Sequence, residues 1–246
     1  MRWWRAVRQG VMTLAGLVPA GASADDDEVA RHRMVAEVVE MARQTARETG
    51  RPVFAPRTLA ALEAVPRHRF VPPAERSRAY FNTPLAIGAG QTISQPYIVA
   101  LMTDLLELRP SDRVLEVGLG SGYQAAVLAQ LAATVYSMEI VPELARAAQA
   151  TLAEVGYRNV ETRIGDGHAG WPERAPFDAI LVAAAAAEVP PALVAQLKAG
   201  GRLVIPLGTS TATQTLYLVH KDGEGRLRRA AILPVRFVPF TGGTTP

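Results

Sequence analysis

The stretch that most constrains the fold is residues 113–124, Arg-Val-Leu-Glu-Val-Gly-Leu-Gly-Ser-Gly-Tyr-Gln. Its apolar first half predicts a buried strand, and a helical run at 125–132 follows it. Between them lie three glycines that predict a tight turn, Gly118, Gly120 and Gly122. A strand, a glycine turn and a helix in this order form the usual ligand-binding corner of an α/β protein.

The spacing of these glycines narrows the class of ligand. A dinucleotide fingerprint, G-x-G-x-x-G, would place its third glycine at position 123, which is Tyr123. A phosphate-binding P-loop would need a lysine after the glycines, and none follows here. The turn therefore suits a ligand other than a pyrophosphate.

Strand-like and helix-like segments alternate after this turn. Helices are expected at 29–48, 57–65, 97–108, 142–155 and 190–197, and strands at 134–140, 160–164, 177–182, 202–206, 215–220 and 230–238. Alternation of this kind predicts an α/β fold with a doubly wound, mostly parallel sheet. Because no helix separates the last two strands, we expect them to be antiparallel neighbours.

The domain organisation follows from this pattern. We expect an N-terminal helical and substrate-loop region at 25–112, packed on an α/β core at 113–246, with 25–246 forming one globular domain. Residues 80–96 stand out within the first region, because glycines and prolines there block a long helix or a clean strand. Loops of this composition often carry ligand contacts.

Composition excludes several kinds of chemistry. The chain has 246 residues, about half of them apolar, which is enough for a sizeable core. It has no cysteine, so disulfides, a cysteine nucleophile and thiolate metal sites are excluded. Its four histidines are scattered and lack metal-ligand spacing, so we expect no metal.

The first 24 residues differ from the rest of the chain. They carry all of the net charge of +3, through Arg2, Arg5 and Arg8, so the remainder is neutral and we expect no nucleic-acid partner. A short apolar run and Ala22-Ser23-Ala24 resemble a cleaved secretory signal, and the run is too short for a stable membrane anchor. The alternative is a retained N-terminal extension.

Two acidic residues follow the next expected strands. Glu139 lies near the end of one and Asp166 just after another, so both reach the same sheet edge as the glycine turn. Glu139 suits ribose hydroxyls, and Asp166 suits an exocyclic amine of adenine. Taken singly, Glu139 could be a solvated strand end and Asp166 a turn residue. Together with the glycines they favour S-adenosylmethionine and a class I methyltransferase fold, which is Rossmann-like.

Several motifs resemble the protein-L-isoaspartate O-methyltransferase family, from about residue 34 to the end. The segments that carry the resemblance are Gln91-Thr92-Ile93-Ser94-Gln95-Pro96, Val114-Leu115-Glu116-Val117-Gly118 with Gly120-Ser121-Gly122-Tyr123-Gln124, Gly165-Asp166-Gly167 with Gly170-Trp171, Ala175-Pro176-Phe177-Asp178-Ala179-Ile180, and Val235-Arg236-Phe237-Val238-Pro239. The first and last are specific to the family, whereas the glycine motif is shared by methyltransferases in general.

Three positions depart from the family's pattern. Leu119 and Ala183 stand where threonine is common, and Ala86 stands where a proline is usual. Loss of the hydroxyl at position 119 is expected to weaken one cofactor contact, whereas the backbone donors of the turn are retained.

The resemblance implies methylation of the α-carboxyl group of isoaspartyl residues in damaged proteins or peptides, giving an ester that collapses to a succinimide. It implies Ser94 as the active-site residue. A capping role for Ser94 before the following helix is the alternative. The substrate-binding residues implied are Thr92, Ile93, Ser94 and Gln95. The cofactor-binding residues expected are Glu116, Gly118, Gly120, Gly122, Glu139, Ile140, Asp166, Gly167 and Thr241.

Other functions fit the same residues. A small-molecule carboxylate or hydroxyl could be the methyl acceptor, or the chain could bind S-adenosylmethionine without catalysis. Cytosine-C5 chemistry is excluded because it needs a cysteine nucleophile. We expect a monomer, cytoplasmic by the resemblance and by cofactor supply, or exported to the periplasm if residues 1–24 act as a signal.

Overall fold

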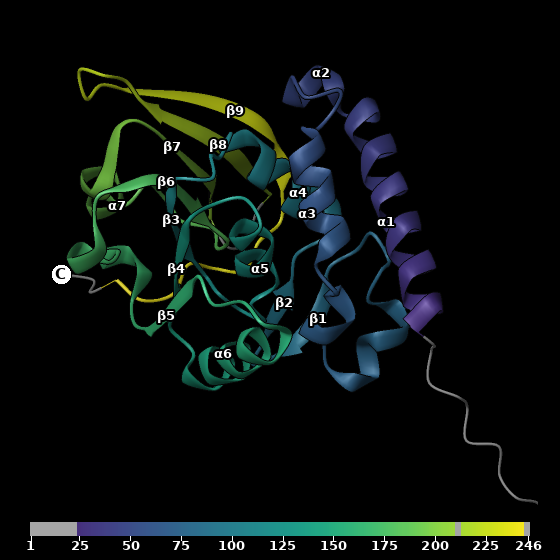
Figure 1. The fold of residues 1–246 in the computed structure, drawn as a ribbon. Helices are drawn as coiled ribbons and strands as arrows, with labels where there is room; N and C mark the ends of the chain where they lie inside the picture. The colour runs from purple at the N-terminus through teal and green to yellow at the C-terminus, as the bar shows by residue number, and fades with distance from the viewer. Residues whose placement is uncertain (1–23, 210–212, 244–246) are drawn as a thin grey trace, which may run out of the picture.

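A central sheet organises the protein in the computed structural model, which describes residues 24–209 and 213–243 (Figure 1). The described part contains a seven-stranded sheet in the order β5-β4-β3-β6-β7-β8-β9. Its strands are β3 (Arg113–Val117), β4 (Thr134–Glu139), β5 (Val160–Ile164), β6 (Phe177–Val182), β7 (Leu197–Leu207), β8 (Gln214–Lys221) and β9 (Leu227–Val235). The segment 113–117 is thus a central strand, as its apolar sequence predicts.

The sheet is parallel from β5 to β7 and antiparallel from β7 to β9. This confirms the mostly parallel sheet and the antiparallel final pair. Several strand boundaries differ from the prediction. The largest differences are in β7, which begins at Leu197 rather than at 202, and in β9, which spans Leu227–Val235 rather than 230–238. The ends of a strand depend on pairing with its neighbours, which sequence periodicity does not report.

Hydrophobic layers cover both faces of the sheet. Successive residues of β3 belong to different clusters, because Val114 packs with the N-terminal helices and Leu115 packs with β7 and the helix α7 (Pro191–Gln196). One face is covered by α3 (Pro56–Ala64), α4 (Pro96–Leu105), α5 (Tyr123–Ala129) and α6 (Pro142–Val155). The fold is therefore doubly wound, as predicted.

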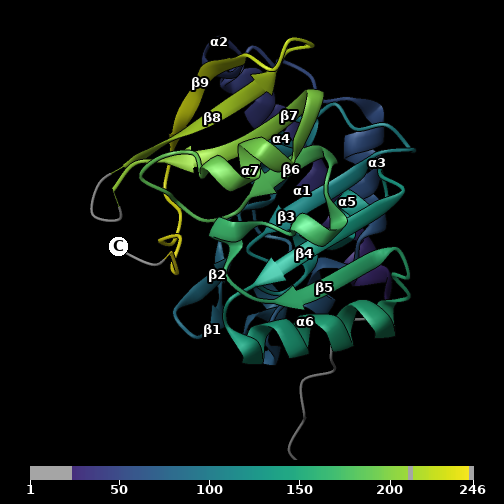
Figure 2. The ribbon, with the colours of Figure 1, turned by 90° about the vertical axis from the view of Figure 1, so that its left-hand side faces the viewer.

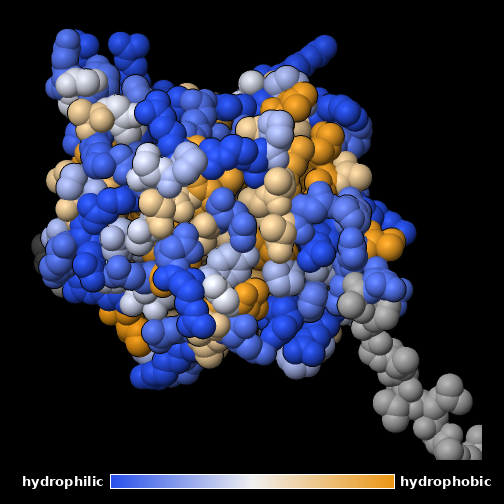
Figure 3. All heavy atoms as spheres, viewed as in Figure 1, coloured by the Kyte–Doolittle hydropathy of each residue, from blue (hydrophilic) through white to orange (hydrophobic). Residues whose placement is uncertain are grey.

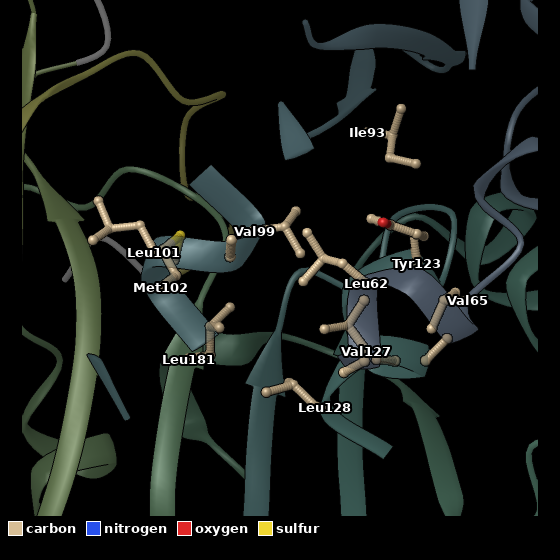
Figure 4. Close-up of a cluster of buried hydrophobic side chains, with 14 of the residues drawn as sticks. Leu62, Val65, Ile93, Val99, Leu101, Met102, Tyr123, Val127, Leu128 and Leu181 are labelled. Carbon is tan, nitrogen blue, oxygen red and sulfur yellow. The ribbon is translucent and has the colours of Figure 1, made fainter. Parts of the chain in front are cut away.

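The N-terminal helices pack against this core rather than standing apart from it. Figure 4 shows Leu62 of α3, Val99 and Met102 of α4, and Val127 and Leu128 of α5 converging in one cluster. Each of these side chains is at most 1% exposed. Burying aliphatic side chains of this size stabilises a fold by about 1.5–3 kcal/mol each, so this cluster is a main source of the packing of the helical region on the sheet.

The first helix differs from its predicted bounds. The expected helix at 29–48 is divided into α1 (Ala24–Gln44) and α2 (Ala46–Thr49). The hydroxyl of Thr45 donates to the carbonyl of Met41, and its oxygen lies 2.5 Å from the Tyr97 hydroxyl. A threonine that bonds back to the preceding turn bends a helix, which accounts for the break.

Residues 80–96 form no long helix, as predicted, but they do form two short strands, whose pairing is irregular between Ala86 and Gly88. This segment contains a two-stranded hairpin, β1 (Leu85–Gly88) and β2 (Gln91–Ile93). The backbone of Gly88, Ala89 and Gly90 has positive φ angles, so the glycines that argued against a strand instead make the turn between two strands. Leu85 and Ile93 are buried and hold the hairpin against the body.

On the face shown in Figure 3, hydrophilic residues cover most of the surface and apolar residues form scattered patches. None of the described helices is both long and apolar enough to cross a membrane. The predicted signal segment, residues 1–24, lies outside the described residues except for Ala24, at which α1 begins.

Candidate active site

A cavity with about 800 Å3 of empty space opens at the carboxyl ends of the parallel strands. Figure 2 shows the β1–β2 hairpin and the C-terminal segment lying on the side toward which the arrowheads of β4 and β5 point. The cavity walls come from β2 and its following loop, the glycine turn, the ends of β4 and β6, and the C-terminal segment at 238–241. Its position, beside the glycine turn at the carboxyl ends of parallel strands, suits a nucleotide-like ligand.

The glycine turn is shaped by its backbone. Gly118 has a φ angle of +95°, and a Cβ atom there would lie 3.4 Å from the Cβ of Ala183, so a larger residue would be strained. The N–H groups of Gly118 and Leu119 both donate to the carbonyl of Met138, at 2.9 and 3.0 Å. Gly122 donates to the carbonyl of Leu119 at 2.8 Å. Most donors of the turn are thus already paired, and the turn contributes shape more than free donors.

Glu139 links the glycine turn to the end of β4. Its carboxylate accepts hydrogen bonds from the N–H groups of Gly120, at 2.8 Å, and Val141, at 3.0 Å. The residue is only 7% exposed, yet it lies in the cavity wall. Each carboxylate oxygen keeps a second lone pair, so Glu139 can brace the turn and still accept a ligand hydroxyl.

Glu116 occupies a different position from the one expected. It is fully buried behind the wall and is not a lining residue of the cavity. One carboxyl oxygen, Oε2, accepts a short hydrogen bond from the Ser137 hydroxyl, whereas Oε1 has no partner among the described residues. Burial raises the pKa of Glu116 to about 8, with the Ser137 hydrogen bond opposing this and the charge of Glu139 adding to it. The group is therefore mainly protonated at neutral pH.

Asp166 also lies outside the cavity wall, under the C-terminal segment. Its carboxylate accepts hydrogen bonds from the N–H groups of Gly243, at 2.6 Å, and His168, at 2.9 Å. Although burial opposes the effect, these donors lower the pKa of Asp166 below its ordinary value. The His168 ring stacks on Phe240 with centroids 3.8 Å apart. The turn-residue alternative for Asp166 thus has support in this structure.

The loop after β2 places Ser94 between two cavities. A second cavity, with about 1210 Å3 of empty space, adjoins the first along residues that line both, namely Thr92, Ser94, Ala183 and Val238. The helix α4 that follows is capped at Gln95 without a side-chain hydrogen bond. No described residue is hydrogen-bonded to the Ser94 hydroxyl, so the capping alternative has no support here.

Most of the predicted site residues come together. The first cavity is lined by Thr92, Ile93, Ser94, Gly118, Gly120, Glu139, Ile140, Gly167 and Thr241. Gln95 lines the second cavity. Glu116, Gly122 and Asp166 line neither. A Cβ atom on Gly167 would lie 2.2 Å from a methyl carbon of Val117, which explains why only glycine fits there.

Sequence reasoning missed two aromatic residues of the wall, Tyr123 and Phe240. The signal for Phe240 was present, because it follows the family-like segment 235–239. The C-terminal chain is held in place by hydrogen bonds between Ala185 and both Val238 and Phe240, each 2.8 Å long. Among the described residues, no group of three or more His, Asp or Glu side chains could hold a metal ion.

The sheet order, the antiparallel end of the sheet and the cavity over the glycine turn define a class I S-adenosylmethionine-dependent methyltransferase. The sequence profile of the protein-L-isoaspartate(D-aspartate) O-methyltransferase family matches residues 40–245. The chain belongs to this family.

Individual proteins agree with this assignment. A Syntrophobacter fumaroxidans protein named protein-L-isoaspartate O-methyltransferase 2 is 53% identical, over 95% of this chain and 94% of its own length. A solved structure of a protein-L-isoaspartate O-methyltransferase is 29% identical with a TM-score of 0.74, over 87% of this chain and 66% of that one. A structure from Plasmodium falciparum, described as a complex with S-adenosyl-L-homocysteine, is 22% identical and shares the fold, with a TM-score of 0.70 over 87% of this chain and 98% of that one.

Proposed function

We propose that the protein transfers a methyl group from S-adenosylmethionine to the α-carboxyl group of L-isoaspartyl residues in damaged proteins and peptides. The observation that carries the proposal is the junction of the two cavities at Thr92 and Ser94. The first cavity contains the glycine turn that suits the methyl donor, and the second adjoins it on the side from which an acceptor peptide would enter. A methyl group at the junction would be within reach of an acceptor in the second cavity.

The residues of the first cavity fit the donor. Glu139 offers free lone pairs for the ribose hydroxyls, and Gly118 and Gly167 keep the wall open for a bulky ligand. When bound, S-adenosylmethionine supplies a methyl group on a positively charged sulfur, and this sulfur is a good leaving group. We further propose that Asp166 contacts the adenine once the C-terminal segment moves from it.

The acceptor needs little acid–base help. A carboxyl group with an ordinary pKa near ~4 is already ionised at neutral pH, so it can attack the methyl carbon directly. The protein's task is then to align the carboxylate and to exclude water. We assign this task to the Ser94 hydroxyl, whose hydrogen-bonding capacity no described residue uses, with Thr92, Ile93 and Gln95 beside it. The absence of a general-base requirement accords with the lack of a His–Asp pair in the cavity wall of the described chain.

The test compares two peptides of identical sequence, one with an L-isoaspartyl and one with a normal aspartyl residue. With labelled S-adenosylmethionine, we expect the isoaspartyl peptide alone to be labelled, as a base-labile methyl ester. Equal labelling of both peptides, or labelling of neither, would contradict the proposal. Binding of S-adenosylhomocysteine without any turnover would instead support a non-catalytic binding module.

We also propose that the chain acts as a monomer, without nucleic acid or a membrane anchor, and that residues 25–246 work as one globular unit. The neutral charge of the chain beyond residue 24 supports the absence of a nucleic-acid partner. The shared hydrophobic cluster of the N-terminal helices and the sheet supports the single globular unit. Light scattering should give a mass no greater than the 26.3 kDa of the full chain; twice this mass would contradict the monomer.

A further inference from the structure

Arg67 is a buried cation beside the proposed acceptor site. It lies in the short 3-10 turn η1 (Arg67–Phe70), and it is 0% exposed. Within the described part of the chain, no carboxylate forms an ion pair with it. Burial lowers the pKa of Arg67 to about 10, so the guanidinium is still charged at neutral pH.

Its contacts lead to the Ser94 loop and to the cavity wall. The Nη2 group donates to the main-chain carbonyl of Ser94 at 2.8 Å, and Nε donates to the carbonyl of Ala79 at 2.8 Å. The guanidinium carbon lies 4.6 Å from the centroid of the Tyr123 ring, a cation–π contact. Tyr123 and Ser94 both line the first cavity. Arg67 thus connects two wall residues from behind.

A buried charge without a counter-ion is costly for folding. The penalty for removing such a charge from water is several kcal/mol, and two carbonyls and one aromatic ring offset only part of it. An uncharged side chain would pack here at lower cost. One hydrogen-bonding group of Arg67, Nη1, also has no partner among the described residues. Because its charge is not compensated within the described chain, Arg67 favours the binding of an anion nearby.

The other charges of the two cavities do not supply this attraction. Glu139 is the one charged side chain in the described wall of the first cavity, and it would repel an anion. Arg236 is the one charged side chain in the described wall of the second, but it is exposed, so water screens it. Arg67 is screened far less because it is buried.

We propose that Arg67 is a positioning residue for the acceptor carboxylate. It fixes the Ser94 loop through the main-chain carbonyl, and its buried charge makes the junction of the two cavities favourable for an anion. This inference rests on the proposed function, because the anion is the α-carboxylate of the isoaspartyl residue. No bond is made or broken at Arg67 itself.

The test couples the charge of Arg67 to the charge of the ligand. Two peptides are used, an isoaspartyl peptide with its free α-carboxylate and the same peptide with a neutral α-carboxamide. Their dissociation constants are measured by calorimetry with S-adenosylhomocysteine bound, for the wild type, Arg67→Met, Arg67→Lys, Arg236→Met and Arg57→Met. Arg57 is the matched control, because it also donates to two main-chain carbonyls, those of Leu108 and Leu131, away from both cavities.

We expect the wild type to prefer the carboxylate peptide and Arg67→Met to lose about tenfold of that preference. Binding of the carboxamide peptide and of S-adenosylhomocysteine should change less than twofold. Arg57→Met should leave the preference unchanged. Arg67→Lys should keep most of the preference because the charge remains. Its kcat should fall about tenfold, because an ammonium group cannot donate to the carbonyls of Ala79 and Ser94 with the same fork.

An equal loss for both peptides in Arg67→Met would overturn the inference. So would a loss of preference in Arg236→Met alone, or a kcat for Arg67→Lys within twofold of the wild type. If Arg67→Met does not fold, the Arg67→Lys kinetics decide. If the wild type itself shows no preference for the carboxylate, the proposed function fails, and the inference fails with it. A preserved wild-type preference with an unchanged Arg67→Met value refutes the Arg67 inference alone.

Discussion

The donor and acceptor halves of the site differ in how their polar groups are satisfied. In the donor half, the glycine turn and Glu139 are tied together by backbone hydrogen bonds to Gly120, Val141 and Met138. In the acceptor half, the Ser94 hydroxyl and the Nη1 group of Arg67 have no described partner. Most polar groups of the donor half are thus hydrogen-bonded within the protein, whereas the acceptor half contains polar groups that are free to bind a ligand. Glu116 is one exception in the donor half, and Tyr123, whose hydroxyl also has no described partner, is another.

The largest effect should come from Glu139→Ala in the donor half. This change leaves two N–H groups without an acceptor and removes the ribose contact that we propose, each loss being about 1–3 kcal/mol. We expect the dissociation constant of S-adenosylhomocysteine to rise about 100-fold by calorimetry. Glu143→Ala, an exposed change in the first turn of α6, is the matched control and should have no effect. An affinity within threefold of the wild type would remove Glu139 from the donor site.

Ser94→Ala should produce the opposite pattern. A hydrogen bond to a charged group contributes about 1.5–3 kcal/mol, so kcat should fall between about 10- and 100-fold. The affinity for S-adenosylhomocysteine should change less than twofold, because Ser94 belongs to the acceptor half. Ser77→Ala, an exposed change in the 3-10 turn η2 (Pro73–Arg78), serves as the control. A matched loss of cofactor affinity in Ser94→Ala would mean that the two halves are not separate.

Glu116→Gln tests the buried carboxyl group of the donor half through the pH dependence of stability. The folded carboxyl has a pKa of about 8 and the ordinary value is 4.5, so the folded state holds a proton that the unfolded state has lost between these values. The protonated form therefore supports stability below about pH 4.5, and this support is lost as the pH rises through about 8. In ligand-free protein, the free energy of unfolding in urea should decrease between pH 5 and pH 9. This decrease should be smaller for the glutamine variant than for the wild type, by on the order of 1–3 kcal/mol. An identical decrease in both proteins would contradict the raised pKa.

The smallest effect should come from Arg69→Met, two residues after Arg67. Arg69 forms an ion pair with Glu154 at the surface, and both side chains are more than a third exposed. Water screens such pairs, so we expect a loss of less than about 1 kcal/mol in the free energy of unfolding and no change in kcat. Urea unfolding beside Arg67→Lys would check this contrast. A loss as large as that of the buried arginine would show that burial is not what distinguishes them.

The donor half was largely predictable from the sequence, because its signals are local. A strand, a glycine turn and an acidic residue at the next strand end recur in order along the chain, and the parallel sheet brings such ends to one edge. Glu139 and Gly118 accordingly line the cavity. The prediction could not distinguish lining from supporting residues, so Glu116 was assigned to the wall although it points behind it toward Ser137.

The acceptor half was less predictable because its contacts are distant in sequence. Arg67 lies in a proline-flanked segment without a local signal for its burial, and only the fold brings it to Ser94, 27 residues later. Glycines at 88 and 90 argue against a strand locally, but the pairing of Leu85 with Ile93 makes them a hairpin turn. Distant contacts also occur in the donor half, where Asp166 meets Gly243 across 77 residues. Periodicity within a segment does not report such contacts.

The division of labour between the two halves is tested most directly by methyl transfer to an isoaspartyl peptide at saturating S-adenosylmethionine. Glu139→Ala should then recover a kcat within about threefold of the wild type, because excess donor compensates for weak binding. Ser94→Ala should stay at least about tenfold slower at any donor concentration. A Glu139→Ala enzyme that stays slow at saturation, or a Ser94→Ala enzyme that recovers, would contradict the account.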